Sequence, residues 1–188
     1  MTAPEAKPQL DEEDLRQVRQ IFEWTRTGHG QAIASCLQQG LPANLRNEKG
    51  DSLLMLAAYH GHVEVARALL DAGADPELQN DRGQTPLAAA VFKGDEPMCR
   101  LLIERGARVD GRMADGKTAF IMAAMFGRTA LMDLLVEHGA DPAARDAVGW
   151  DGEALARKMA AGPALEWFAA RRPSHVLAGL TRNPGGGG

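Results

Sequence analysis

The sequence predicts an all-α solenoid in which short helical pairs repeat along the chain. Two observations carry this prediction: glycines recur at a fixed interval of ~33 residues, and the segments between them show the apolar spacing of α-helices. Three glycine series share the interval: Gly50, Gly83, Gly116 and Gly149; Gly61, Gly94 and Gly127; and Gly73, Gly106 and Gly139. Such repetition is typical of arrays in which each unit buries its apolar face against its neighbours.

The first helix of each unit is predicted from a capping residue followed by an alanine-rich segment. Thr85 can cap a helix N-terminus, and Pro86 fits the first helical position, where its missing N–H costs nothing. Ser52 and Thr118 occupy the same capping position in the units before and after. Small side chains follow each cap and let successive helices pack closely. They include Ala57 and Ala58, Ala89 and Ala90, and Ala123 and Ala124.

A second helix follows each of the turns at Gly61, Gly94 and Gly127. Its apolar residues have helical spacing. They are Val63, Val65, Ala66, Leu69 and Leu70 in one unit, and Leu131, Leu134 and Leu135 in another. The glycine of the GAD or GAR sequence then provides the left-handed residue that ends a helix. The dipeptides Asp75-Pro76 and Asp141-Pro142 begin the extended loop to the next unit.

These features combine into the pattern G-x-T-P-L…A-A…G-H…L-L-x-x-G-A-D-P, which resembles the ankyrin repeat. The resemblance covers roughly residues 15–170 and is most specific at 81–95 and 61–77. It implies an ankyrin-repeat solenoid of about three full repeats of ~33 residues between degenerate caps, with hairpins that project nearly at right angles. The histidine that the family usually carries after T-P-L is replaced by Met55, Ala88 and Ile121. We therefore expect more apolar packing at that position.

The glycine register divides the chain into five units with a tail at each end. We expect full repeats at 48–80, 81–113 and 114–146, and degenerate capping repeats at 14–47 and 147–172. A capping repeat has one face in water, which agrees with the more polar first helix of the first unit. Residues 1–13 and 173–188 are expected to form flexible tails. Val176, Leu177 and Leu180 leave open a return of the second tail onto the last helices.

Composition and charge narrow the possible partners. The chain of 188 residues has a net charge of −4, which disfavours nucleic acid and anionic membranes as main partners. No stretch approaches the ~20 apolar residues of a membrane span, and the N-terminal residues lack the apolar centre of a secretory signal. Cys36 and Cys99 fall in second helices of different units and are expected to be buried thiols. We therefore expect a cytoplasmic protein, with an Arg-, Ala- and Gly-rich composition common in high-GC bacteria.

The residue pattern contains no recognisable catalytic motif. We find no HExxH, no G-x-x-x-x-G-K-[ST] and no G-x-S-x-G. His29 and His62 occupy the family's G-H turn position, where the expected role is local hydrogen bonding. His60 and His62 lie on either side of a turn rather than at metal-ligand spacing. We therefore expect no catalysis, no metal and no cofactor.

The resemblance places the binding surface on the concave side of the stack, at the hairpin tips and the exposed end of each first helix. The helix-end positions given by the register are Tyr59, His60, Phe92, Lys93, Met125 and Phe126. The hairpin positions include Asp51, Arg82, Gln84, Lys117 and Trp150. Five of these residues could form an apolar stripe across four units: Tyr59, Phe92, Met125, Phe126 and Trp150. For Phe126 and Trp150, packing against the adjacent repeat is an equal alternative.

Exposed aromatic side chains flanked by charges are typical of protein interfaces. The sequence therefore predicts a non-catalytic interaction module that binds a protein or peptide partner on its concave surface. A structural role is the alternative, in which the same stripe mediates self-association into a homodimer or an assembly subunit. A role as a stress-response or effector adaptor also stays open.

Overall fold

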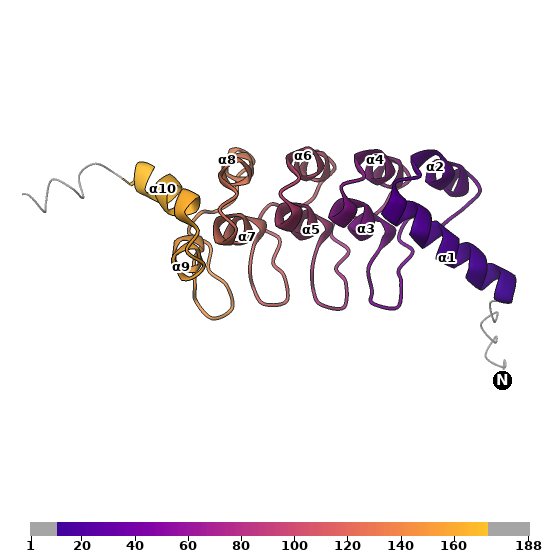
Figure 1. Ribbon diagram of the computed structural model, residues 1–188, viewed down its shortest axis with the longest axis horizontal. Helices are drawn as coiled ribbons and strands as arrows, with labels where there is room; N and C mark the ends of the chain where they lie inside the picture. Colours follow the sequence, from indigo (N-terminus) through magenta and orange to yellow (C-terminus); the bar gives the residue numbers. More distant parts are fainter. Residues whose placement is uncertain (1–10, 173–188) are drawn as a thin grey trace, which may run out of the picture.

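The computed structural model describes residues 11–172, which form ten α-helices arranged as five pairs (Figure 1). The first helices of the pairs are α1 (Glu12–Thr27), α3 (Leu53–His60), α5 (Pro86–Lys93), α7 (Ala119–Met125) and α9 (Gly152–Lys158). The second helices are α2 (Gly30–Gln38), α4 (Val63–Asp71), α6 (Glu96–Glu104), α8 (Thr129–Glu137) and α10 (Gly162–Ala170). Over these residues the only extended pairing is two isolated bridges, Arg46–Ser52 and Arg145–Asp151. The all-α solenoid is confirmed.

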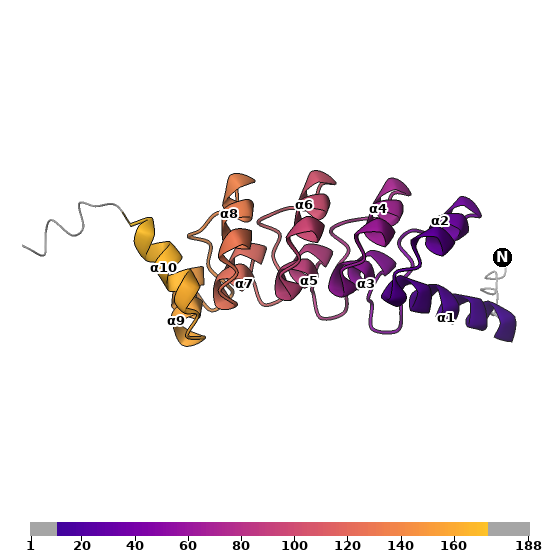
Figure 2. The ribbon, with the colours of Figure 1, turned by 45° about the horizontal axis from the view of Figure 1, so that its top comes forward.

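The helices form two rows along the long axis of the molecule. In Figure 1, α2, α4, α6 and α8 make the upper row, and α3, α5 and α7 make the row beneath it. Each first helix packs against the first helix of the next pair, from α1 to α9, while α10 packs against both α8 and α9. Hairpins project from the lower row, and Figure 2 shows the pairs following one another in the turned view.

The first helices of the three central units form the middle of the core because they have neighbours on both sides. Residues 53–58, 86–91 and 119–124 are all buried. Alanines on these helices let the backbones approach closely, which favours dense packing. Met55, Ala88 and Ile121 are also buried, so apolar packing does occupy the position of the missing histidine.

The helix caps follow the prediction from sequence. Ser52, Thr85 and Thr118 each accept a hydrogen bond from the backbone N–H three residues ahead. The first helices then end at a left-handed residue, which is a glycine in the first four units. In the last unit the same register position is Ala160, which keeps a left-handed φ of 53° despite its side chain.

Helix α1 begins earlier than the sequence predicted. The Asp11 carboxylate accepts from the N–H groups of Glu13 and Asp14, and the Asp14 carboxylate accepts from the Asp11 N–H. This capping box starts the helix at Glu12, two residues before the first predicted unit at 14–47. Helix α1 has 16 residues, whereas the other first helices have seven or eight. The tail predictions for 1–10 and 173–188 lie outside the described residues.

The two histidines of the G-H turns behave differently. The His29 ring makes the expected local hydrogen bond, from Nδ1 to the Thr27 hydroxyl at 2.8 Å. The His62 ring instead joins two units, because its Nε2 lies 2.7 Å from the carbonyl oxygen of Arg26. Gly28 lies directly beneath this ring with φ at 81°, and an added Cβ would come within 2.6 Å of the His62 Nδ1. Only glycine fits there.

Hydrogen bonds between neighbouring hairpins hold the units in register. One side chain of each hairpin donates to a main-chain carbonyl of the next: Arg46 to Gln79, Gln79 to Arg112, and Arg112 to Arg145, each 33 residues further on. A second set of side-chain oxygens accepts from backbone N–H groups of the next unit: Asn44 from Asp75, Glu77 from Arg108, and Asp110 from Asp141. Both ladders make the hairpins a continuous surface.

Candidate partner-binding surface

Three exposed aromatic rings form a row along the C-terminal ends of the first helices. Tyr59 and Phe92 lie near the C-terminal ends of α3 and α5, and Phe126 directly follows α7. The Tyr59 and Phe92 rings stack with centroids 6.3 Å apart, and Phe92 meets Phe126 edge-on at 5.3 Å. The Lys93 ammonium lies 5.1 Å from the Tyr59 ring centroid. The row therefore crosses three units.

The other two members of the predicted stripe lie elsewhere. Met125 is half-buried and packs against the small core cluster of Ile121, Ala144 and Leu155. Trp150 lies in the last hairpin, with the ammonium of Lys158 4.8 Å from its ring centroid. Among the described residues, no aromatic contact joins Trp150 to the row. The stripe across four units is thus a row of three rings with a separate tryptophan.

Some of the predicted hairpin side chains are already bonded within the protein, whereas others are free to contact a partner. Asp51 and Gln84 stabilise the hairpins, because the side chains of both accept a hydrogen bond from the amide of Asn80, at 2.8 and 3.1 Å. The Asn80 oxygen accepts in turn from the backbone N–H groups of Arg82 and Gln84. Lys117 pairs with the carboxylate two residues before it at 2.5 Å. The exposed Arg82 guanidinium has no hydrogen bond or ion pair within residues 11–172, so it is available to a partner.

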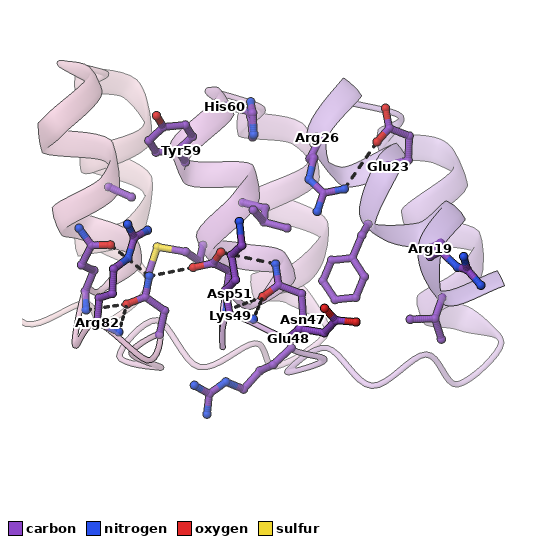
Figure 3. Close-up of a pocket in the computed structure, with 18 of the residues that line it drawn as sticks. Arg19, Glu23, Arg26, Asn47, Glu48, Lys49, Asp51, Tyr59, His60 and Arg82 are labelled. Carbon is purple, nitrogen blue, oxygen red and sulfur yellow. Dashed lines mark hydrogen bonds and ion pairs between the residues drawn. The ribbon is translucent and has the colours of Figure 1, made fainter. Parts of the chain in front are cut away.

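A groove of about 1330 Å³ lies between α1, α3 and α5 and the two hairpins that precede α3 and α5 (Figure 3). It gathers six of the predicted residues: Asp51, Tyr59, His60, Arg82, Gln84 and Phe92. The other five lie outside its lining: Lys93, Lys117, Met125, Phe126 and Trp150. One wall is the face of α1 that carries Leu15, Arg19, Phe22 and Arg26. The predicted surface is therefore most concave at its N-terminal end.

The contribution of α1 was not predicted from the sequence. The ankyrin resemblance gives the binding positions only from the full repeats onward, which begin at residue 48. The signal was present, because Leu15, Val18 and Phe22 recur at helical spacing with arginines between them. This spacing places an apolar face and several cations on one side of a helix that the stack covers only in part.

His60 lies at the edge of the groove, at the C-terminal end of α3. Its ring stacks on the His62 ring with centroids 6.2 Å apart. Partial burial lowers the pKa of His60 below the usual 6.5, and the charges of His62, Arg26 and Lys93 lower it further. His60 is therefore mostly neutral at pH 7, and the positive charge of the groove comes from its arginines and lysine.

The metal-ligand geometry, the helices and the two thiols of residues 11–172 can be described directly. Between residues 11 and 172, no three His, Cys, Asp or Glu side chains converge to hold a metal ion. None of the helices there has the length and apolar character that crossing a membrane requires. Both cysteines are free; Cys99 is buried, whereas Cys36 is only half-buried. Burial, aided by Asp95 and Glu96, raises the pKa of the Cys99 thiol to about 12, which makes it a poor nucleophile.

Stacked helical pairs with a concave, aromatic-bearing surface define a class of repeat proteins that bind partners along the stack. A family model of ankyrin repeats, in three copies, matches residues 24–80 and 54–146. These ranges cover more than half of the chain, which belongs to the ankyrin-repeat family. An ankyrin repeat protein of Pseudomonas aeruginosa is 59% identical over 56 residues, 30% of this chain and 33% of that protein. The chain thus aligns with about a third of that relative's length. Ankyrin repeats are generally protein–protein interaction modules.

Proposed function

We propose that this chain is a non-catalytic interaction module that binds a protein or peptide partner on its concave surface. The observation that carries the proposal is the row of Tyr59, Phe92 and Phe126, in which the central Phe92 ring contacts both of the others at the surface. Aromatic side chains in such positions are frequent hot spots, and truncating one typically costs ~2 kcal/mol or more of binding free energy. Charged side chains beside them adjust specificity and association rate more than affinity.

Affinity capture from a lysate of the source cell tests the proposal. Three baits are compared: the wild-type chain, Tyr59→Ala/Phe92→Ala, and a control, Val136→Ala/Met159→Ala. The control removes exposed apolar side chains that lie outside the groove and the row. The wild type and the control should retain the same partner, and the aromatic variant should lose it while keeping its circular dichroism spectrum. Retention by all three baits would place the interaction on another face and contradict the proposal.

Self-association is a second candidate function because the same row could pair with its copy on another molecule. Sedimentation over a range of protein concentrations tests this candidate. A dimer that dissociates in Tyr59→Ala/Phe92→Ala would favour it, and a monomer at all concentrations would exclude it. We also propose a cytoplasmic location, since two free thiols suit a reducing compartment; cell fractionation tests that location.

A further inference from the structure

The groove between α1, α3 and α5 carries a charge opposite in sign to that of the whole chain. Its lining includes six cationic and three anionic side chains, whereas the chain has a net charge of −4. The cations are Arg16, Arg19, Arg26, Arg46, Lys49 and Arg82, and the anions are Glu23, Glu48 and Asp51. A positive groove on an acidic protein is a specific feature of this surface, because composition alone would not produce it.

Contacts within the protein already occupy two of the three anions. Asp51 accepts from the amides of Asn47 and Asn80, and Glu23 lies 3.5 Å from the Arg26 guanidinium. Glu48 is left as the one groove carboxylate without a bonded partner among residues 11–172.

Four of the six cations have no carboxylate partner in the same range. Arg16 and Arg19 donate only to carbonyl oxygens of their own helix, and Lys49 and Arg82 form no ion pair within residues 11–172. Figure 3 shows Arg19 on α1, and Lys49 and Arg82 on the two hairpins. Cationic groups therefore reach the groove from three separate elements.

Apolar side chains are exposed in the groove, between these cationic side chains. Leu15 on α1 is 41% exposed, and Tyr59 and Phe92 on the facing helices are 41% and 45% exposed. An apolar patch rimmed by polar groups is typical of an interaction site. The groove therefore offers contacts for negative charges and for a large apolar side chain together.

We propose that this groove binds an acidic peptide segment that carries one large apolar side chain. The inference rests on the proposed function and names the class of partner. Carboxylates of the segment pair with Arg19, Lys49 and Arg82, and guanidinium groups favour such pairs because they can donate two parallel hydrogen bonds. The apolar side chain packs on Tyr59 and Phe92. A nucleic acid fits less well, because Glu48 opposes a uniformly charged backbone, whereas a peptide can place a neutral residue there.

Fluorescence anisotropy with synthetic peptides and the full chain tests the inference. The probe is a labelled peptide of Glu and Asp with one central Trp. Comparison peptides replace the acidic residues by Lys, or the Trp by Ser. Arg19→Gln/Arg82→Gln removes two groove cations, and the matched control Arg67→Gln/Arg100→Gln removes two exposed cations from α4 and α6, outside the groove lining. The two variants have the same net charge.

The acidic Trp peptide should bind, and more weakly as salt is added. The groove variant should weaken its binding about tenfold, a modest loss of two charge contacts, while the control stays near wild type. Equal binding of the acidic and basic peptides, or equal losses in the two variants, would overturn the inference. Tighter binding of a single-stranded oligonucleotide than of the acidic peptide would also overturn it. A dimer of this chain that the peptide does not dissociate would do the same.

These results also separate the inference from the proposed function. A captured partner that depends on Tyr59 and Phe92, with no binding of the acidic peptide, would reject the acidic class of partner alone. If no captured partner depends on Tyr59 and Phe92, and the acidic peptide does not bind either, the concave surface is rejected as a binding site.

Discussion

Replacing Asn80 should destabilise the stack, because this side chain holds two neighbouring hairpins together. Its side chain makes four hydrogen bonds and is 5% exposed. Three of them lie within its own hairpin, to Arg82 and Gln84, and the bond to Asp51 joins that hairpin to the one before. At about 1 kcal/mol for each net hydrogen bond, Asn80→Ala should lower the free energy of unfolding by ~2–4 kcal/mol.

Asn47 is a matched control because it has the same place in the preceding hairpin. Its oxygen also accepts from two backbone N–H groups, but its amide reaches only Asp51 of its own hairpin, at a long 3.4 Å. Asn47→Ala should therefore cost about half as much. Urea unfolding followed by circular dichroism measures both. Equal losses for the two variants would refute the claim that the bond between hairpins stabilises the stack.

A carboxylate at residue 80 should make the free energy of unfolding depend on pH. Asn80→Asp keeps the oxygen that accepts from the backbone but places a carboxylate against that of Asp51. Repulsion raises the pKa of the pair in the folded state above the usual ~4. The folded variant then binds more protons than the unfolded one, so its stability relative to wild type falls as pH rises above ~4. A pH-independent difference would contradict this mechanism.

The remaining predictions concern backbone conformation and titrating groups. Gly116→Ala should destabilise more than Gly149→Ala: both have positive φ, but only at Gly116 would the new Cβ lie 2.4 Å from another hairpin's backbone. Ala160→Gly should raise the melting temperature, because it removes left-handed strain of ~1–2 kcal/mol against a smaller unfolded-state entropy cost. Cys99 should react with maleimide only after unfolding. The NMR titration midpoint of His60 should lie below 6.5, so this residue should reduce stability as pH falls below ~6.5.

The repeat architecture was predictable because its signals are local. A capping residue such as Thr118 and a left-handed glycine such as Gly139 each fix a helix end within a few residues. Repetition of these signals set the stacking order as well. The earlier start of α1 was also encoded, in the capping box of Asp11 and Asp14, although it lies outside the repeat pattern.

The detailed surface was less predictable because register gives the place of a residue along the chain but not the direction of its side chain. Met125 shares the register of Tyr59 and Phe92, yet α7 is one residue shorter than α3 and α5. The residue after its end, Phe126, continues the aromatic row, while Met125 packs inward. A change of one residue at a helix end decides which of two adjacent side chains becomes available to a partner.

The two ends of the stack differ in a way that explains where the groove lies. At the C-terminal end, Trp167 covers Phe120 and donates to Asp133 at 2.7 Å, so aromatic packing seals the last repeat. At the N-terminal end, the long and more polar α1 covers the core with Phe22 while it keeps Leu15 exposed. The same helix thus caps the array and forms one wall of the groove. Deleting α1 would remove both the cap and the groove wall, so a loss of binding could not be distinguished from a loss of stability. Only substitutions on the groove face of α1 can separate the two roles.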